Sequence, residues 1–190
     1  MDELVLVRHA ETEWSGRRYC GRTDLPLTTR GEMTAMRLGR ELAGSLPQAA
    51  RIVSSPRLRA RQTAAAIAAA AGSGAFVVDD RWAETDFGAA EGLTYDELEY
   101  ALPQVAARLV RGDATIDWPG GETAVALRTR VEAAWRDLTE RPGSVVVVSH
   151  GGPLRIAIAL ALDAIPGDVA VPDPGTIWRR RRDPVLRFPA

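Results

Sequence analysis

The sequence has little of several features that would point to particular classes of protein. Its 190 residues include one cysteine, Cys20, so no intramolecular disulfide can form, and no cysteines and histidines have zinc-ligand spacing. The net charge is −1, which gives no argument for binding nucleic acid or a membrane. No apolar run approaches the ~20 residues that cross a bilayer, and the first residues do not resemble a signal peptide. We therefore expect a cytoplasmic protein without a metal or other cofactor.

The length fits one domain with a single core, and we expect residues 1–190 to form it. Short apolar, partly β-branched runs predict strands at 4–7, 52–53, 76–78, 145–148, 176–178 and 185–188. Helices are predicted between them, at about 28–45, 58–71, 122–140 and 153–162, with shorter ones beginning near 94 and 103. Four consecutive valines at 145–148 are typical of a strand buried on both faces. The alternation predicts a three-layer α/β/α sandwich with a mostly parallel sheet.

Two predicted helices show an apolar face. In the first, we expect this face to contain Met33, Met36, Leu38 and Leu42. In the helix at about 122–140, the apolar residues are Val125, Leu127, Val131, Trp135 and Leu138.

Both histidines of the chain follow predicted strands. His9 comes after the first strand, and His150 follows the valine strand and Ser149. In an open parallel α/β sheet, ligands bind beyond the carboxyl ends of the strands, so this fold places both imidazoles at the functional edge. A lone histidine there is more often structural, but two together favour a functional site.

Arginines accompany the histidines. Arg8 is adjacent to His9, and the helix after the second strand begins with Arg57, Arg59 and Arg61. A guanidinium offers a rigid fork of donors that suits phosphate oxygens, and a helix N-terminus adds free backbone N–H groups. A single arginine is more often a solvated surface group, but the set indicates an oxyanion site.

Other groups near the same edge have suitable chemistry. Gly151 and Gly152 would let the backbone approach an oxyanion closely. A carboxylic acid there could protonate a leaving alcohol, and by position alone Glu84, Asp86 and Glu91 are all candidates.

These residues resemble the motifs of the histidine phosphatase superfamily, in its phosphoglycerate mutase-like branch. Residues 6–12, with Arg8 and His9, are similar to the family's nucleophile motif. Further similar segments follow in the family's order over most of the chain: 18–21, 24–28, 31, 54–55 with 59–64, 84–88 with 91–92, 119–122 and 148–152. The resemblance implies a phosphoglycerate mutase-like α/β/α fold and an enzyme that needs no metal.

The resemblance also implies roles for individual residues. His9 would be the nucleophile that carries the phosphoryl group, and Glu84 would protonate the leaving oxygen and later activate water. Phosphate oxygens would be bound by Arg8, Arg59 and His150, and we extend this prediction to Ser15, Gly21 and Gly151. Arg57 and Arg61 do not align with the family's phosphate arginine.

Three positions depart from the family's usual residues. Ala10 replaces the glycine that commonly follows the nucleophile, and Ser15 stands where many members have an asparagine that touches the phosphate. Serine is shorter but can still donate a hydrogen bond. Cys20 stands where related phosphatases often have glutamine and mutases threonine. Its thiol would be oxidation-sensitive near the pocket and inert if buried.

The resemblance favours a phosphatase acting on a small phosphorylated metabolite. The chain resembles the compact phosphatases, including the α-ribazole phosphatases, more than the glycolytic mutases, because the segment between Glu84 and His150 is shorter than in those mutases. The alternatives are a phosphoglycerate mutase, a protein phosphohistidine phosphatase, whose relatives tend to be shorter, and a non-catalytic binding module. Four arginines at 179–182 could suggest nucleic-acid binding, but a solvated strand end explains them, and no nucleic-acid or membrane partner is expected.

Substrate choice is expected to depend on the irregular stretch at about 92–118, which could cover the site. Its candidate contacts are Tyr95, Arg108, Arg111 and Trp118, although Trp118 could equally be core and the arginines solvent-facing. The family contains monomers and homodimers, and the sequence does not choose between them.

Overall fold

The computed structural model describes residues 2–47 and 50–181, and its strands form one five-stranded sheet. The strands are β1 (Glu3–Arg8), β2 (Arg51–Ser54), β3 (Val77–Val78), β4 (Val145–Ser149) and β5 (Ile177–Arg181). They lie in the order β3-β2-β4-β1-β5. β3, β2, β4 and β1 are parallel, and β5 is antiparallel to β1, which confirms the mostly parallel sheet.

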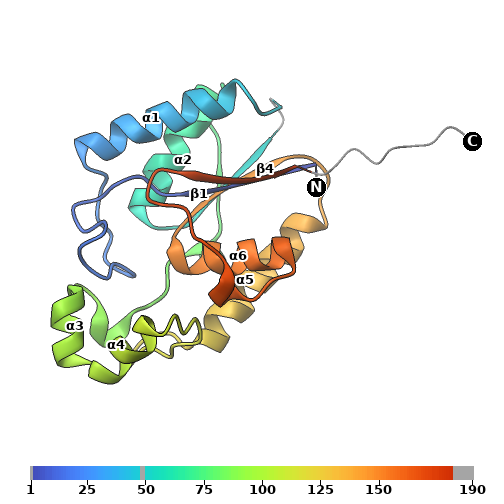
Figure 1. Ribbon diagram of the computed structural model, residues 1–190. Helices are drawn as coiled ribbons and strands as arrows, with labels where there is room; N and C mark the ends of the chain where they lie inside the picture. The colour runs from blue at the N-terminus through green and yellow to red at the C-terminus, as the bar shows by residue number, and fades with distance from the viewer. Residues whose placement is uncertain (1, 48–49, 182–190) are drawn as a thin grey trace, which may run out of the picture.

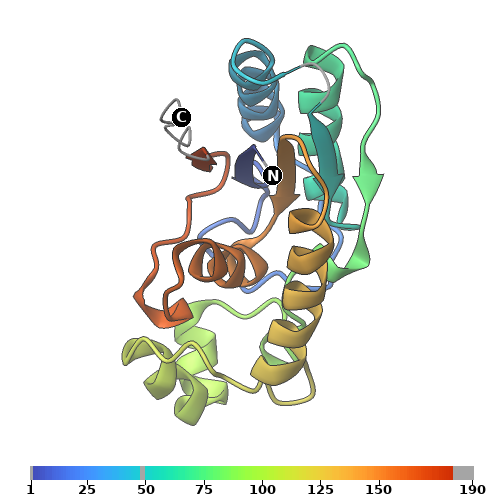
Figure 2. The same ribbon diagram turned by 90° about the vertical axis from the view of Figure 1, so that its right-hand side faces the viewer.

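Helices cover both faces of this sheet (Figures 1 and 2). One face carries α1 (Thr29–Ala43) and α2 (Leu58–Ala70), and the other carries α5 (Ala124–Thr139) and α6 (Gly151–Leu162). Alternate strand residues separate two cores, because successive side chains point to opposite faces. Val146 and Val148 pack with α1 and α2, whereas Val145 and Val147 pack with α5 and α6. The predicted three-layer sandwich is therefore confirmed, and β4 is buried on both faces.

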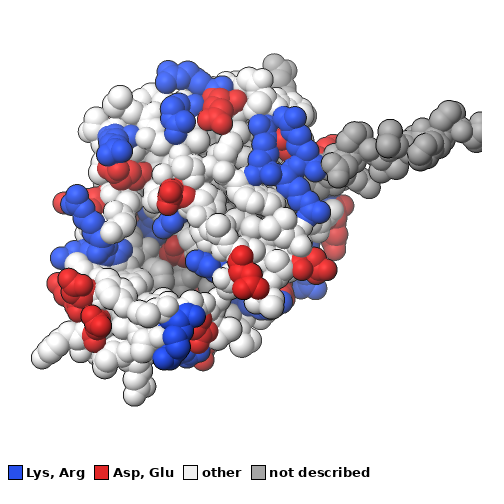
Figure 3. All heavy atoms as spheres, viewed as in Figure 1, with Lys and Arg blue, Asp and Glu red and all other residues white. Residues whose placement is uncertain are grey.

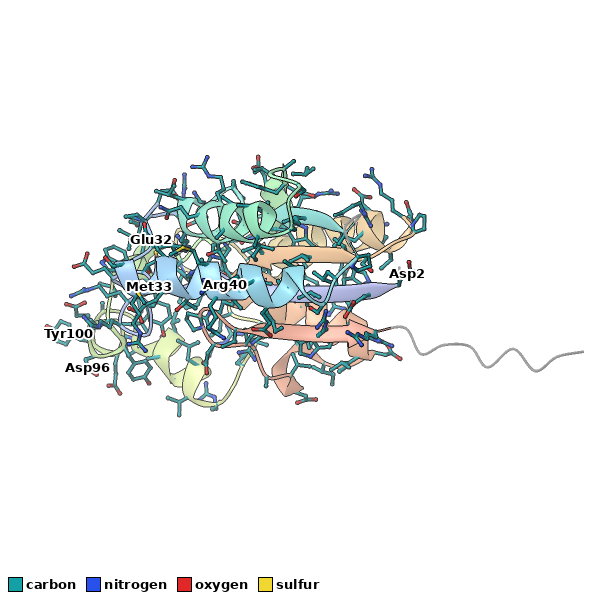
Figure 4. All side chains as sticks on the ribbon, turned by 90° about the horizontal axis from the view of Figure 1, so that it is seen from above. Asp2, Glu32, Met33, Arg40, Asp96 and Tyr100 are labelled. Carbon is teal, nitrogen blue, oxygen red and sulfur yellow. The ribbon has the colours of Figure 1, made fainter. Side chains whose placement is uncertain are left out.

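The predicted apolar face of α1 is partly wrong. Met33 and Met36 are 63% and 52% exposed, and Figure 4 shows Met33 and Arg40 on the outer side of α1. The buried face consists instead of small and branched residues: Gly31, Ala35, Leu38, Gly39 and Leu42. α1 packs closely on α2, where a Cβ added to Gly39 would lie 2.6 Å from the carbonyl oxygen of Ala66. The contact thus fixes which face of α1 is buried, and Met33 and Met36 lie outside that face.

The predicted apolar face of α5 is also partly wrong. Val125 is exposed, whereas Val131, Ala134 and Leu138 are buried.

The arginine run near the C-terminus lies within a strand rather than after one. Residues 179–181 belong to β5, which extends beyond the predicted 176–178. Arg179 and Arg181 both form ion pairs with Glu3 of the neighbouring strand β1. Arg182 and the predicted strand at 185–188 lie outside the described residues.

A small lobe lies at the carboxyl ends of the parallel strands. It contains α3 (Tyr95–Ala101), which begins with the predicted capping box at Thr94, and α4 (Pro103–Val110). Its core is separate from the sheet's two cores and includes Leu98, Ile116 and Trp118. Figure 4 shows Asp96 and Tyr100 at the opposite end of the molecule from Asp2, so this lobe lies on the side of the histidines.

Three short 3-10 helices were not predicted: η1 (Asp80–Trp82), η2 (Gly88–Ala90) and η3 (Pro166–Asp168). Each is a single turn, too short to give a periodic apolar pattern in the sequence. Along the described ranges, no helix combines the length and apolar character needed to cross a membrane.

Candidate active site

The pairing of β1 with β4 brings the two histidines together. Arg8 pairs in parallel register with Ser149, so the next residues, His9 and His150, leave the sheet side by side. Their ring centroids are 4.9 Å apart, and both side chains are buried. The expectation that both imidazoles share one edge of the sheet agrees with this geometry.

His9 is held as a neutral imidazole with a lone pair on one ring nitrogen. Its Nδ1 lies 2.8 Å from the carbonyl oxygen of Ala10, an acceptor, so Nδ1 carries the proton and Nε2 carries the lone pair. Burial lowers the pKa of His9 to about 3, and the nearby positive charges of Arg59 and Arg8 act in the same direction. At neutral pH, Nε2 is therefore an unprotonated nucleophile.

His150 lies behind the nucleophile and is completely buried. Its Nε2 lies 2.7 Å from the hydroxyl oxygen of Ser55, which follows β2. Its Nδ1 is buried and has no hydrogen-bond partner within residues 2–47 and 50–181. Burial and the charge of Arg59 hold the pKa of His150 well below its usual value, so this ring is also neutral.

Arg59 is completely buried near the start of α2. Its Nε donates to Nε2 of His9 over 3.3 Å. Its terminal nitrogens donate to carbonyl oxygens of the loop at residues 20–23, at 2.9 Å for Thr23, 2.8 Å for Cys20 and 3.2 Å for Gly21. The guanidinium is therefore fixed between this loop and the nucleophilic nitrogen, with one N–H aimed at the reacting position.

Glu84 is held by backbone N–H groups at the start of α6. Its Oε1 accepts from Thr85 at 2.9 Å and from Gly152 at 3.1 Å, and its Oε2 accepts from Gly151 at 3.1 Å. A negative side chain suits the N-terminus of a helix. A Cβ added to Gly152 would lie 2.8 Å from Oε1 of Glu84, so the close approach requires glycine here. The glycines after His150 therefore position a carboxylate.

These groups meet at a cavity of about 360 Å³. Figure 3 shows the molecule hollowed between its main body and the lobe of α3 and α4, with charged side chains of both signs at the rim. Of the predicted site residues, the cavity is lined by Arg8, His9, Ser15, Glu84 and Gly151. Arg59 and His150 are not lining residues, but each lies against the ring of His9.

Some predicted phosphate ligands are already engaged within the protein. The backbone N–H of Gly21 donates to the carboxylate of Glu91, and Gly21 does not line the cavity. The hydroxyl of Ser15 accepts from the backbone N–H of Thr12 at 2.8 Å. One terminal nitrogen of Arg8 donates to the carbonyl of Pro172, while its buried Nε has no partner in the described part of the chain. Phosphate binding by these groups stays a prediction.

The structure separates the four candidate substrate contacts in the small lobe. Tyr95 lines the cavity, whereas Trp118 is buried in the lobe's core, the alternative that the sequence left open. Arg108 forms an ion pair with Asp113, and Arg111 is not a lining residue. Cys20 lines the cavity while half-buried, and burial raises the pKa of its thiol.

Sequence reasoning assigned no role to several residues at the site. Trp14, Tyr19 and Phe87 line the cavity together with Tyr95 and form an aromatic wall. Trp14 and Tyr19 lie in the irregular stretch after the nucleophile motif, where no periodicity marks which side chains face inward. Ser55 is part of a family-like segment, but its contact with His150 follows only from the pairing of β2 with β4.

The low pKa values of the two histidines predict that acid destabilises the fold. Between about pH 3 and 6.5, His9 binds a proton when unfolded but not when folded, so the free energy of unfolding falls as pH drops below 6.5. The loss from His9 should reach about 2 kcal/mol at pH 5, and His150 should act in the same direction. Urea unfolding at pH 7 and pH 5 measures it. His9→Ala should lose less stability than the wild-type protein over this interval, and equal losses would contradict a neutral, buried His9.

The fold and the site together are those of the histidine phosphatase superfamily, whose members are phosphatases or mutases. The sequence profile of the histidine phosphatase superfamily (branch 1) matches residues 4–171, and the chain belongs to this family. The probable phosphoglycerate mutase GpmB of Salmonella paratyphi C is 39% identical over 165 residues, which cover 85% of this chain and 75% of that protein.

Solved structures agree with this assignment. A phosphoglycerate mutase from Thermus thermophilus is 36% identical with a TM-score of 0.71, over 93% of this chain and 91% of the other. A structure described as mycobacterial hydrolase 1 is 28% identical with a TM-score of 0.83, over 94% and 88% of the two chains. The phosphoglycerate mutase-like fold is thus confirmed.

Proposed function

We propose that this protein is a phosphoric monoester hydrolase that removes phosphate from a small metabolite through a phosphohistidine on His9. The observation that carries the proposal is the state of His9: neutral, with its Nε2 lone pair beside the Nε–H of Arg59 in a cavity that Glu84 also lines. This arrangement supplies a nucleophile, a positive charge and a proton donor around one point.

In the first step, Nε2 of His9 attacks phosphorus, and the bond from phosphorus to the ester oxygen breaks. For this step Glu84 must first take up a proton, which it gives to that oxygen, so an alcohol leaves rather than an alkoxide. In the second step, the Glu84 carboxylate takes a proton from water, which attacks phosphorus and breaks the P–N bond. Inorganic phosphate leaves, and both residues return to their starting states.

Phosphoryl transfer has a loose transition state with charge spread over the equatorial oxygens, so catalysis consists mainly of positioning and charge stabilisation. Arg59 would donate its Nε–H to a phosphoryl oxygen, because this N–H already points at Nε2 of His9. Arg8 also lines the cavity. Its buried Nε has no hydrogen-bond partner among the described residues. The two guanidinium groups supply the positive charge in this mechanism, which therefore includes no metal ion.

The aromatic wall favours a leaving group with a large apolar or planar part. Trp14, Tyr19, Phe87 and Tyr95 offer ring faces and edges to whatever is attached to the phosphate. We propose that the segment at 92–118 covers the substrate, with Tyr95 as its contact. α-Ribazole 5′-phosphate, whose leaving group carries an aromatic base, suits this wall better than 3-phosphoglycerate does.

A phosphoglycerate mutase is the second candidate, and the names of the relatives favour it. A mutase would pass the phosphoryl group from His9 to a second phosphoglycerate and would have to protect it from water. The short segment between Glu84 and His150 argues for a hydrolase. The small lobe argues against a protein phosphohistidine phosphatase, because it narrows access to His9 for a folded protein substrate.

Phosphate release from a panel of phosphomonoesters, measured with EDTA present, tests the proposal. The panel comprises α-ribazole 5′-phosphate, 3-phosphoglycerate, benzyl and ethyl phosphate, sugar phosphates, nucleotides and 4-nitrophenyl phosphate. Hydrolysis in EDTA, with benzyl phosphate preferred over ethyl phosphate, is expected. Interconversion of phosphoglycerates without release would establish the mutase, and loss of activity on adding EDTA would contradict the metal-independent mechanism.

A further inference from the structure

Glu91 lies outside the cavity lining but accepts a set of backbone hydrogen bonds. Its carboxylate accepts from three consecutive N–H groups of the loop at 20–23: Gly21 at 3.0 Å, Arg22 at 3.3 Å and Thr23 at 2.9 Å. Glu91 follows η2, seventy residues along the chain from Gly21. The bonds therefore attach this loop to the segment that also carries Glu84.

The same loop holds Arg59 from its other side. Arg59 donates to the carbonyl oxygens of Cys20, Gly21 and Thr23. The carbonyl of residue 20 and the N–H of residue 21 belong to one planar peptide group, and those of residues 21 and 22 belong to the next. In a trans peptide, the N–H and the C=O point in opposite directions. Two rigid peptide groups thus stand between the Glu91 carboxylate and the Arg59 guanidinium, bonded to both.

This arrangement has an electrostatic consequence. Arg59 is completely buried, and the charges of Glu84 and Asp24 act on it, although neither carboxylate forms an ion pair with it in the described ranges. An anion that accepts from the N–H of a peptide polarises that group and makes its carbonyl oxygen a stronger acceptor. The negative charge of Glu91 therefore reaches the guanidinium through the two peptides, without a direct contact that would compete with a phosphate.

The loop also needs glycine at residue 21. A Cβ at this position would lie 2.2 Å from the carbonyl oxygen of Thr85 and 2.9 Å from Oε2 of Glu91. The close approach allows the loop, Arg59 and the residue after Glu84 to pack as one unit. Packing alone thus requires glycine at residue 21.

We infer that Glu91 is a positioning residue for the phosphate-binding Arg59, which it holds through the peptide groups joining residues 20–22. The inference rests on the proposed function in one respect, that Arg59 binds the transferring phosphoryl group. Its effect is to fix the Nε–H of Arg59 at Nε2 of His9, where a displacement of about 1 Å is worth about 100-fold in rate.

The test replaces Glu91 with Gln and measures the affinity for inorganic vanadate, together with kcat/KM for 4-nitrophenyl phosphate. Gln keeps the shape of Glu but removes the charge and turns an amide NH₂ toward the loop's N–H groups. We expect Glu91→Gln to weaken vanadate binding and lower kcat/KM by similar factors, about 10- to 100-fold. Arg22→Ala is the matched control, because it removes an exposed ion pair with Asp86 on the same loop and keeps the backbone N–H. It should change both quantities less than about threefold.

A double-mutant cycle with Arg59→Lys separates positioning from general loosening of the fold. If Glu91 acts through Arg59, then adding Glu91→Gln to Arg59→Lys should weaken vanadate binding less than about threefold further. Fully additive losses would overturn the inference, as would unchanged vanadate affinity in a folded Glu91→Gln variant. Thermal unfolding of each variant confirms that it is folded. Vanadate binding without hydrolysis of any ester would refute the proposed function alone, and its absence in the wild-type protein would refute Arg59 as an oxyanion ligand.

Discussion

Replacing His9 with Ala should lower kcat/KM by at least about 10⁴-fold for every phosphomonoester that the protein hydrolyses. The variant loses the nitrogen positioned to attack phosphorus, and His150 cannot replace it, since that ring is completely buried and its Nε2 is bonded to Ser55. Steady-state kinetics measures the loss. Brief mixing with a ³²P-labelled substrate should also label the wild-type protein with an acid-labile, base-stable phosphate, and the variant should take up none.

Met33→Ala serves as the control for this experiment, because Met33 is an exposed residue of α1 that does not line the cavity. It should keep wild-type kinetics and labelling. Substantial turnover by a folded His9→Ala variant would show that water attacks the ester directly, and the covalent mechanism would then be wrong.

Replacing Glu84 with Gln should slow the reaction to an extent that depends on the leaving group. An alkoxide needs a proton as it leaves, so kcat/KM for ethyl phosphate should fall by about 10²- to 10⁴-fold. 4-Nitrophenolate leaves without a proton, so kcat/KM for 4-nitrophenyl phosphate should fall much less. The ratio kcat/KM is the proper quantity, because it reports transfer to His9 and not the later hydrolysis of the phosphohistidine.

Glu132→Gln is the matched carboxylate control, since Glu132 forms an exposed i,i+4 pair with Arg128 on α5 and does not line the cavity. It should leave both substrates unaffected. If Glu84→Gln slowed the two substrates equally, Glu84 would not be the proton donor, and its three backbone hydrogen bonds would have a structural role only.

The layered fold could be predicted because its signals are local. The valines of β4, the alanine-rich sequence of α2 and the capping box at Thr94 each indicate their element within a few residues. Met33 shows where such reasoning fails. Its apolar character suggests burial, but which face of α1 is buried depends on the packing against α2, whose residues lie far along the chain and approach α1 most closely at Gly39.

The site was predictable to a similar degree. The positions of His9 and His150 after two strands follow from the sequence together with the rule for parallel sheets. The setting of Arg59 does not, because its guanidinium is held by carbonyls of a loop that has no regular structure. The role of Glu91 was hidden for the same reason: by sequence it was one of three equivalent acid candidates, and only the folded loop shows that its oxygens are occupied by backbone donors.

The run of valines in β4 has a consequence for the fidelity of folding. If β4 shifted its register against β1 by one residue, most positions of this strand would still hold a valine. Hydrophobic packing would therefore scarcely distinguish the two alignments. The shift would nevertheless move His150 to the other face of the sheet and separate it from His9. The correct alignment must therefore be selected at the end of the strand, where Ser149 donates to the carbonyl of Trp82 and His150 meets Ser55. The polar residues at the active-site end of β4 thus determine the register of this strand in the sheet.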